Sequence, residues 1–326
     1  MINNSLQMKS GKAFEYSILK EFKEKLDKLT TVKVIKNDAL TTARNCFETF
    51  SIQEQGRYLL TASFAVNFLM DIEPRLSNEV GKNDILQLEI LTDYQGQLGD
   101  VRDIIVIRAQ QKWEIGISAK NNNSAVKHSR LSNEIDFGSK WLGIKCSQTY
   151  FDEINAVFIP LKKIKMRSNS TETWNSLTNK KNNVYVPILN SFKKELYRIY
   201  QISPSKVASG LIKYLVGIKD FYKVIKGNNQ VEIQAYNLYG SLNLPFKNIE
   251  PKFKTPRIKL PDKISDISFK KNSKTTLIVT LNNNWKLSFR IHNASSRIEP
   301  SLKFDINLLK TPNCLFKNTL SVLQGD

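Results

Sequence analysis

The stretch of sequence that decides the fold reads VRDIIVIR over residues 101–108 and WEIGISA over residues 113–119. The first segment is rich in β-branched residues, and the second alternates Trp, Ile and Ala with Glu, Gly and Ser, which is typical of a half-buried strand. Residues 109–112, AQQK, form a short polar connection. Two strands joined by so short a turn predict an antiparallel hairpin.

The predicted hairpin brings an acidic residue and a lysine together at its open end. If the strands pair symmetrically around Gln110 and Gln111, Asp103 lies opposite Ser118, with the two side chains roughly 5 Å apart. Lys120 follows two residues later and shares that face of the sheet. A carboxylate there can bind Mg²⁺, and an ammonium beside it can orient an attacking water and stabilise charge on a phosphate. A surface Asp–Lys ion pair would give the same pattern.

The rest of the N-terminal part mixes helices with strands. The helical period predicts one helix over residues 10–29, capped by Ser10, and another over residues 52–72, ending before Pro74. After a polar loop we expect a helix over residues 133–144 and a strand over residues 156–161. Residues 184–188 and the amphipathic run 191–200 close this part. Helix, hairpin, helix and strand in this order predict an α+β core.

Beyond Ser203 and Pro204 the sequence changes to short strands with Lys-rich turns. Residues 277–281 and 285–291, separated by three consecutive Asn residues, predict a second hairpin. We therefore expect a boundary near residue 200, with a catalytic domain over residues 1–200 and a basic domain over residues 201–326.

The formal net charge of the 326-residue chain is +19, and it is unevenly distributed. Residues 1–160 contain 20 Lys+Arg and 20 Asp+Glu, whereas residues 161–326 contain 29 and 10. A field of this sign attracts polyanions, so nucleic acid and an anionic membrane surface are the candidate partners. A compositional bias toward Lys, Asn and Ile is the alternative explanation, although such a bias should also have charged the first half.

The sequence argues against several classes of protein. Its longest nearly apolar stretch, residues 58–70, has 13 residues, which is too short to span a bilayer. The first residues, MINNSLQMKSGKAFEY, lack the apolar core and the cleavage site of a signal peptide, so we expect a cytoplasmic protein. Cys46, Cys146 and Cys314 are odd in number and widely separated, which argues against a disulfide framework and against a zinc site.

Asp103 followed by Ser118-Ala119-Lys120 resembles the active-site motif of the PD-(D/E)XK nucleases. The departure is Ser118, which stands where those nucleases have an acidic residue. Glu114 faces the same side, but four residues of strand place it about 13 Å away along the chain. That distance is too long for Glu114 to share a metal ion with Asp103.

The resemblance implies a source for the missing carboxylate. Some restriction endonucleases of this superfamily have Ser in the motif and supply the carboxylate from the next helix, at the 16-residue offset that corresponds to Glu134. Asp136 is the fallback. The resemblance further implies that Asp103 and Glu134 hold Mg²⁺, that the Ala119 carbonyl completes the coordination, and that Lys120 acts on the attacking water.

Two other acidic residues bear on this site. In the nuclease superfamily a Glu of the first helix often approaches the metal, and the corresponding residue here is Glu15; an exposed helix Glu is the alternative. Asp100 competes with Asp103 for the first position of the motif. The predicted pairing places Asp100 opposite Asn121 and facing away from Asp103, so we favour Asp103.

Longer stretches of the sequence indicate one family within this nuclease superfamily. GKAFEY (11–16), GDVRDI (99–104), WEIGISAKNNNSAVKHSRLS (113–132), DFGSKWLG (136–143) and SFRIHNASSRIEPSLKFD (288–305) are similar to the HaeIII-type restriction endonucleases. The resemblance implies a restriction-endonuclease-like core, with a mixed central sheet flanked by helices, and a basic C-terminal lobe that reads DNA.

The same resemblance implies an activity and its partners. The expected reaction is Mg²⁺-dependent cleavage of double-stranded DNA at GGCC in a restriction-modification system, with a cognate methyltransferase as genetic partner. A twofold-symmetric site suits a homodimer. A monomer that cuts the two strands in turn is the alternative.

Two segments carry the candidate DNA contacts, because they combine basic residues with hydrogen-bonding side chains. The candidates are Lys127, His128, Ser129 and Arg130 in the first half, and Arg290, His292, Asn293, Ser295 and Arg297 in the basic half. Arginine reads guanine O6 and N7 with two hydrogen bonds, which suits a G·C-rich site. A solvated basic hairpin would give the same composition.

Two rival interpretations of the chain have the same basic half. One is a non-catalytic DNA-binding protein, in which the first hairpin is only scaffold, and the other is a structure-specific repair nuclease that cuts without a fixed sequence. The carboxylate–lysine cluster separates the first rival from a nuclease. If the cluster is catalytic, the protein should cut duplex DNA when Mg²⁺ is added and leave it intact in chelator.

Overall fold

A computed structural model describes residues 2–77, 84–92, 100–121, 127–167 and 171–322. The chain forms two compact units, and each consists of segments that are far apart in the sequence. Unit 1 comprises residues 1–123, 217–258 and 314–326, and unit 2 comprises residues 124–216 and 259–313. The structure therefore divides the chain differently from the expected domains 1–200 and 201–326, because strands from the last third of the chain complete the sheet of unit 1.

The charge follows these units rather than the two halves of the chain. Unit 2 contains 25 Lys+Arg and 10 Asp+Glu, so it carries +15 of the net charge of +19, whereas unit 1 contains 24 and 20. The middle of the chain supplies part of this excess through Lys-rich helices. The basic region is thus unit 2 and not a lobe made only of C-terminal residues.

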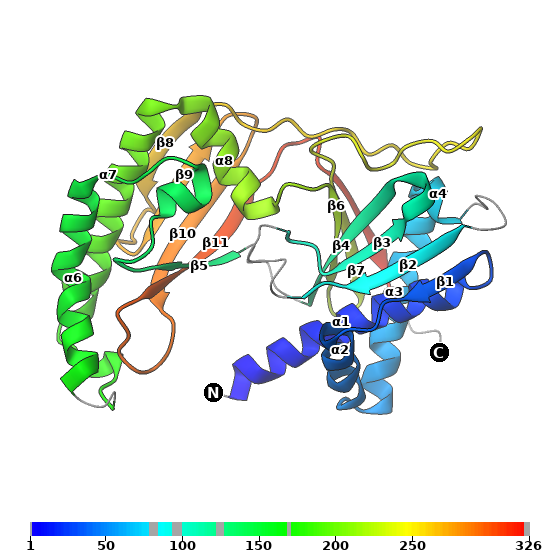
Figure 1. The fold of residues 1–326 in the computed structure, drawn as a ribbon, viewed down its shortest axis with the longest axis horizontal. Helices are drawn as coiled ribbons and strands as arrows, with labels where there is room; N and C mark the ends of the chain where they lie inside the picture. Colours follow the sequence, from blue (N-terminus) through cyan, green and yellow to red (C-terminus); the bar gives the residue numbers. More distant parts are fainter. Residues whose placement is uncertain (1, 78–83, 93–99, 122–126, 168–170, 323–326) are drawn as a thin grey trace. The chain divides into compact units, whose positions relative to one another are not determined.

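Within the described residues, unit 1 is built on a seven-stranded mixed sheet with the strand order β1-β2-β3-β4-β6-β7-β12. Its strands are β1 (Thr31–Val34), β2 (Ile85–Ile90), β3 (Ile104–Arg108), β4 (Trp113–Asn121), β6 (Phe221–Lys226), β7 (Gln230–Tyr236) and β12 (Phe316–Ser321). Its helices are α1 (Ile2–Leu26), α2 (Asp38–Glu48), α3 (Ile52–Ile72) and α4 (Pro74–Ser77). Strand β4 pairs in parallel with β6, and antiparallel with β3. This mixed sheet with its helices confirms the α+β class (Figure 1).

The helices of unit 1 cover one face of its sheet. On β4, Ile117 and Ala119 are buried in the same core as Phe14 of α1. Because side chains alternate along a strand, Ser118 and Lys120 point to the opposite face. The polar residues of the predicted site therefore lie on the sheet face that the core does not use.

Strands β3 and β4 form the first predicted hairpin in the predicted register. Arg108 pairs with Trp113, and Ile104 pairs with Ile117. The connection is a 3₁₀ turn, η1 (Ala109–Gln111), which Lys112 ends with a left-handed φ of 49°. The pairing confirms that the hairpin closes around Gln110 and Gln111.

Unit 2 contains, within the described residues, a five-stranded antiparallel sheet with the order β5-β11-β10-β9-β8. Its strands are β5 (Lys127–Leu131), β8 (Ile264–Phe269), β9 (Thr276–Leu281), β10 (Lys286–Asn293) and β11 (Leu302–Lys310). Its helices are α6 (Gln148–Arg167), α7 (Val186–Ile202) and α8 (Pro204–Val216), with short turns η2 (Gly138–Leu142), η3 (Trp174–Ser176) and η4 (Lys181–Tyr185) (Figure 1). The rings of Trp141, Phe192, Phe289 and Phe304 pack together and join η2 and α7 to the sheet.

The second predicted hairpin is formed by β9 and β10. Leu287 pairs with Val279, and Phe289 pairs with Leu277. Asn283 and Asn284 have positive φ values of 55° and 63°. Consecutive residues in this region are what a tight hairpin turn requires, and Asn tolerates the conformation better than most residues.

The predicted strand over residues 156–161 is wrong, because these residues lie inside α6. Ile154, Phe158 and Leu161 are buried at helical spacing on one side of that helix, and Pro160 is accommodated within it. A short apolar run fits a buried strand and one face of a helix equally well, so its pattern alone does not separate them.

The predicted helix over residues 133–144 is also wrong. Residues 133 and 134 form a turn, and η2 is a single π-helical turn that ends at Gly143 with a φ of 65°. At the N-terminus, α1 begins at Ile2, so Ser10 lies within the helix and does not cap it. The prediction for residues 52–72 matches α3, which a capping box of Ser51 and Glu54 begins.

In the described part of the chain, no helix combines the length and the hydropathy needed to cross a bilayer. The cysteines are free thiols: Cys46 is buried, Cys146 is half-buried and Cys314 is exposed.

Candidate active site

Asp103 lies directly before β3, where the first hairpin opens. Its N–H donates to the Ile117 carbonyl over 2.8 Å, which extends the ladder by one residue. Its Oδ2 accepts hydrogen bonds from the Ser118 hydroxyl (3.2 Å), the Ala119 N–H (2.7 Å) and the Lys120 ammonium (3.0 Å). The structure thus brings together the residues of the motif that the sequence singled out.

The second carboxylate oxygen of Asp103, Oδ1, has no hydrogen-bond partner among the described residues. Asp103 and Lys120 are both half-buried, so their charged groups remain partly accessible. The donors on Oδ2 fix the orientation of the carboxylate and leave Oδ1 available to a cation or a water.

Glu15 approaches the same place from α1. Its side chain is buried, and its Oε2 accepts a hydrogen bond from Lys12 over 3.0 Å. Burial, and then the negative charge of Asp103, raise the pKa of Glu15 to about 7, against the opposing effects of Lys12 and Lys120. The charges of Asp103 and Lys120 therefore act on Glu15, which is not an exposed helix residue.

Polar contacts fix α1 against the end of β4. The Asn121 side chain, directly after Lys120, donates to the Ser10 hydroxyl. Ser10 in turn hydrogen-bonds the Tyr58 hydroxyl of α3 over 2.7 Å. These contacts hold the part of α1 that carries Glu15 beside the open end of the hairpin.

The oxygen donors of this site suit a hard divalent cation. Mg²⁺ is commonly held by one or two carboxylates together with water, and the carboxylates nearest to this requirement are those of Asp103 and Glu15, whose charges act on each other. A cation would also relieve the repulsion between the two negative charges. Among the described residues, no group of three His, Cys, Asp or Glu side chains could hold a metal. A site here would therefore be completed by a backbone oxygen, such as the Ala119 carbonyl, or by water.

Glu134 belongs to unit 2, whereas Asp103 belongs to unit 1. It lies in a turn rather than at the start of a helix. Its side chain is 75% exposed, and one carboxylate oxygen lies 3.4 Å from Lys162 Nζ. The role of Glu134 in a metal site stays a prediction.

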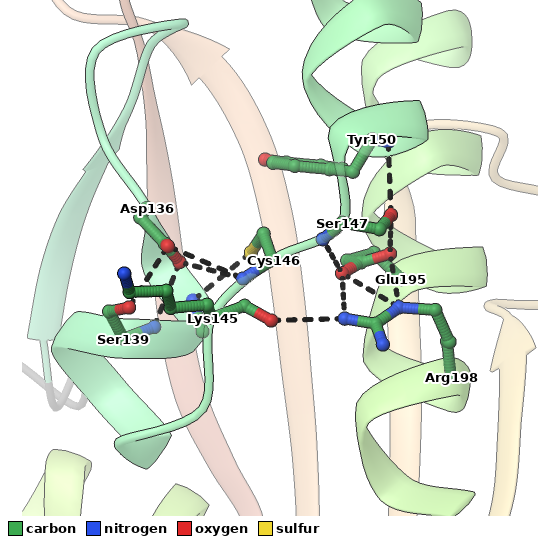
Figure 2. Close-up of polar contacts among 9 residues, drawn as sticks. Asp136, Ser139, Lys145, Cys146, Ser147, Tyr150, Glu195 and Arg198 are labelled. Atoms are coloured by element: carbon green, nitrogen blue, oxygen red, sulfur yellow. Dashed lines mark hydrogen bonds and ion pairs between the residues drawn. The ribbon is translucent and has the colours of Figure 1, made fainter. Parts of the chain in front are cut away.

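Asp136 anchors a loop of unit 2 (Figure 2). Its carboxylate accepts hydrogen bonds from the Ser139 N–H (2.8 Å), the Ser139 hydroxyl (2.9 Å) and the Cys146 N–H (3.2 Å). Although partial burial opposes them, the bonds from Ser139 and Cys146 lower the pKa of Asp136. They occupy both carboxylate oxygens, which favours a structural role over the fallback role as a metal ligand.

Hydrogen bonds to Glu195 connect the same loop to α7 (Figure 2). This buried carboxylate accepts hydrogen bonds from the Ser147 N–H (2.6 Å) and hydroxyl (2.8 Å), and it binds the Arg198 guanidinium. Arg198 also donates to the Lys145 carbonyl over 3.0 Å. Side-chain contacts thus hold an irregular conformation where the sequence pattern favoured a helix.

Glu114 forms ion pairs with two basic side chains elsewhere on the sheet. Arg102 lies 3.0 Å and Lys219 lies 2.8 Å from its Oε1, and Arg102 also binds Asp100. Arg102 crosses β4 above Gly116, where an added Cβ would lie 1.8 Å from the Arg102 Cδ. Glu114 and Asp100 are therefore engaged with Arg102, and only a glycine at position 116 leaves room for that side chain.

In unit 2, Arg290 and His292 both bind Asp305 on the neighbouring strand. Arg290 pairs with Asp305 in the register of β10 and β11 and donates to its Oδ2 through Nε (3.1 Å) and Nη2. His292 Nε2 lies 3.0 Å from the other carboxylate oxygen. Arg290 is nevertheless 61% exposed, so its guanidinium is oriented by Asp305 and still accessible.

The loop after β10 is ordered by its own polar groups. Asn293 accepts a hydrogen bond from the Tyr185 hydroxyl over 2.9 Å and donates to the Ser295 carbonyl. The Ser295 hydroxyl donates to the Arg297 carbonyl over 2.9 Å. Arg297 is exposed, and its side chain has no partner among the described residues.

Strand β5 brings part of the other candidate segment beside β11. Arg130 is exposed and lies 3.5 Å from Glu299. Ser129 is buried and hydrogen-bonds the Tyr214 hydroxyl over 2.7 Å, which favours a role in packing. The side chains of Lys127 and His128 lie outside the described residues.

Lys223 lies near this site, and no sequence motif pointed to it. Strand β6 pairs in parallel with β4, and Lys223 is the partner of Ser118. Its side chain is largely buried, and burial, followed by the charge of Lys120, lowers the pKa of Lys223 to about 8. A lysine inside the apolar strand FYKVIK is the signal that could have drawn attention to it.

Comparisons with known proteins identify the family of the chain. Residues 11–312 match the family model described as HaeIII restriction endonuclease. Over 305 residues, which cover 93% of this chain and 94% of the relative, the chain is 39% identical to the type II restriction enzyme HaeIII of Haemophilus aegyptius. No solved structure matches the chain. The resemblance inferred from the sequence strings is confirmed, and the chain belongs to the HaeIII restriction endonuclease family.

Proposed function

We propose that this protein is a type II site-specific deoxyribonuclease that cleaves double-stranded DNA at GGCC with Mg²⁺ as its cofactor. The observation that carries the proposal is the set of contacts at Asp103, whose Oδ2 accepts from Lys120 and from the Ala119 N–H, in a member of the HaeIII restriction endonuclease family. A carboxylate and an ammonium on one face of a strand end are the groups that phosphodiester hydrolysis needs.

The proposed reaction is in-line hydrolysis of a phosphodiester, in which a water attacks phosphorus while the bond to the leaving oxygen breaks. Asp103 and Glu15 would hold Mg²⁺, which supplies Lewis-acid stabilisation of the developing charge when bound. The Lys120 ammonium, 3.0 Å from Asp103, suits orienting the water and stabilising negative charge on the phosphate. Ser118 and the Ala119 N–H keep the Asp103 carboxylate in its orientation.

We propose Glu15 as the second carboxylate and keep Glu134 as the alternative. The support for Glu15 is electrostatic, because the charges of Asp103 and Lys120 both act on its carboxyl group. The support for Glu134 is the family resemblance. Glu134 is exposed and paired with Lys162, so Mg²⁺ would have to compete with that ammonium.

Glu15→Gln should lower the cleavage rate by roughly 10- to 100-fold and raise the Mg²⁺ concentration that cleavage requires, because it removes one of two metal-binding carboxylates. Glu134→Gln should change the rate by less than about threefold, since an exposed ion pair contributes little. Single-turnover cleavage of a GGCC duplex across Mg²⁺ concentrations compares the two. The reverse order of effects would move the second carboxylate to Glu134.

We propose that unit 2 supplies most of the DNA-binding surface, because it carries +15 of the net charge. Arg290 and Arg297 are exposed and present guanidinium groups suited to guanine edges. The other proposed contacts are Lys127, His128, Arg130, His292, Asn293 and Ser295. The buried Ser129 supports β5 by packing.

Arg290→Ala and Arg297→Ala should each weaken binding to a GGCC duplex by about 1–3 kcal/mol and weaken binding to random duplex much less, because they remove base contacts. Lys271→Ala, which changes an exposed residue of unit 2, should weaken both kinds of binding similarly. The affinities of the three variants for the GGCC duplex and for random duplex, measured at two salt concentrations, test this division between base contacts and backbone contacts. Equal losses on both duplexes for the arginine variants would show that this segment positions DNA without reading it.

We further propose a homodimer and a cognate methyltransferase as genetic partner. GGCC reads identically on both strands, so a dimer would present one active site to each strand. Sedimentation of the protein with and without a GGCC duplex separates a dimer from a monomer that cuts the two strands in turn.

Incubating plasmid DNA with the protein in Mg²⁺ and in chelator tests the proposed function as a whole. We expect cleavage only with Mg²⁺, and end-sequencing of the fragments should place every cut at GGCC. Binding without cutting would favour the non-catalytic DNA-binding protein. Cutting without a fixed sequence would favour the structure-specific nuclease.

A further inference from the structure

Lys223 occupies an unusual position in β6. Its neighbours Tyr222 and Val224 are buried in the core of unit 1, so Lys223 points to the opposite face of the sheet. Only 8% of Lys223 is exposed. Lysine is seldom buried to this extent unless its ammonium is paired with a negative group.

The strand register places Lys223 beside the proposed active site. Asp103 lies opposite Ser118 and binds it, and Ser118 is the partner of Lys223 in the parallel pairing of β4 and β6. Asp103, Ser118 and Lys223 therefore form one row across three adjacent strands. With strands roughly 4.8 Å apart, the Cα atoms of Asp103 and Lys223 lie about 10 Å apart.

The Lys223 ammonium forms no hydrogen bond or ion pair with any described residue. Across β7, its register partner is the neutral Gln234. The carboxylate of Asp103 is already bound through Oδ2 by Lys120. The negative charges of Glu232 and Asp103 act on Lys223, but neither carboxylate forms a hydrogen bond or an ion pair with its ammonium. A largely buried ammonium without a directly bonded anion costs free energy, and the binding of an anion would offset this cost.

Ser118 explains why this cation is left without a partner. An acidic residue at position 118 would lie beside Lys223 in the strand register. The serine hydroxyl instead donates to Asp103. The ammonium groups of Lys120 and Lys223 therefore lie on the same sheet face as Asp103, and Asp103 forms an ion pair only with Lys120.

We propose that Lys223 binds a non-bridging oxygen of the DNA phosphate that is cleaved, so that this phosphate lies between Lys120 and Lys223 on the sheet face opposite the core. The inference rests on the proposed function. It assigns Lys223 a direct contact with the substrate, whereas Lys120 acts on the attacking water.

The test compares Lys223→Met with wild-type enzyme on two GGCC duplexes in chelator. One duplex is unmodified, and the other carries a neutral methylphosphonate at the phosphate that wild-type enzyme cleaves. Neutralising this phosphate should weaken wild-type binding about tenfold. It should weaken binding by Lys223→Met only about threefold, because the Lys223 ammonium is gone and that of Lys120 remains. With Mg²⁺, cleavage of the unmodified duplex by Lys223→Met should fall by roughly 100-fold.

Lys317→Met is the matched control. Lys317 pairs with Gln234, lies in the same row two strands from Lys223, and is exposed. The Lys317→Met protein should lose as much affinity as wild type when the phosphate is replaced by methylphosphonate, and it should cleave the unmodified duplex within about threefold of the wild-type rate. Lys223→Arg keeps the charge, so it should also keep the methylphosphonate effect and recover part of the cleavage rate.

Thermal unfolding separates this role from a structural one. If Lys223 serves the substrate, Lys223→Met removes an unpaired buried charge and should be at least as stable as wild type. A less stable Lys223→Met protein, a wild-type cleavage rate, or an undiminished methylphosphonate effect would overturn the inference. If Lys223→Met does not fold, loss of the methylphosphonate effect in Lys223→Arg would overturn it. Wild-type enzyme that neither binds nor cuts the duplex would overturn the proposed function, and the inference with it.

Discussion

Asp103→Asn and Lys120→Met should each lower the cleavage rate by roughly 10³-fold or more, while the protein still binds a GGCC duplex. Asn keeps the shape of Asp103 and an oxygen for the Ala119 N–H, but it removes the negative charge that would hold Mg²⁺. Met keeps the stem of Lys120 and removes its ammonium. Single-turnover cleavage with Mg²⁺ gives the rates, and duplex binding in chelator shows whether docking is retained.

Lys112→Met provides the control for these two variants. Lys112 lies in the same hairpin, is exposed, and stands at the turn, at the opposite end from Asp103. Its replacement should leave the cleavage rate within about threefold of wild type. Full activity of Asp103→Asn or Lys120→Met would contradict the active-site assignment. Variants that fold but lose duplex binding would instead assign this end of the hairpin to docking.

Glu73→Gln should stabilise the protein at pH 8 and change its stability little at pH 4.5. Glu73 is fully buried after α3, and its Oε1 accepts hydrogen bonds from the Tyr222 hydroxyl (2.6 Å) and the Asn243 N–H (2.7 Å). Its Oε2 has no partner among the described residues. Burial raises the pKa of Glu73 to about 7, against the opposing effects of Tyr222, Asn243 and Arg75.

The direction of the effect follows from the raised pKa. The folded protein holds the Glu73 proton more tightly than the unfolded chain, whose ordinary carboxyl pKa is 4.5. The stability due to the protonated group is present below pH 4.5 and is lost as the pH rises to about 7. Above that, the buried charge costs up to about 3 kcal/mol, which a neutral Gln avoids.

Denaturant unfolding of wild type and Glu73→Gln at pH 4.5 and pH 8 measures this difference. Glu48→Gln is the control, because Glu48 is exposed on α2 and its replacement should change the unfolding free energy by less than about 0.5 kcal/mol at either pH. An equal effect of Glu73→Gln at both pH values would mean that the carboxyl group does not change its charge between them.

The hairpins were predicted well because their information is local. The pairing of Asp103 with Ser118 needs only a short turn and alternating side chains, and the contacts of Asp103 with Ala119 and Lys120 follow from it. The helix of residues 52–72 was predicted for a similar reason, since its period and its end at Pro74 are both visible in the sequence.

The errors arose where distant contacts decide the conformation. Residues 156–161 read equally well as strand or helix, and packing in unit 2 makes them helical. Residues 133–144 have a helical pattern, but Asp136 and Glu195 hold the loop through side-chain hydrogen bonds. Lys223 could not be placed from the sequence, because its partner Ser118 lies 105 positions earlier and parallel pairing over that distance leaves no local signal.

The path of the chain between the units has a consequence for how the protein is made. The chain passes from one unit to the other near residues 123, 216, 258 and 313. Strand β12, which pairs with the outer side of β7, begins at Phe316, 195 positions after β4 ends at Asn121. On the ribosome, a growing chain would therefore expose the Asp103–Lys120 hairpin long before its sheet has all the strands that support it.

Strand pairings this distant in sequence form late, because the intervening chain must be synthesised and ordered first. We expect unit 1 to reach its final structure only after residue 321 has left the ribosome. For a protein that we propose cuts DNA, this order of assembly would keep unfinished chains from damaging the chromosome of the cell that synthesises them.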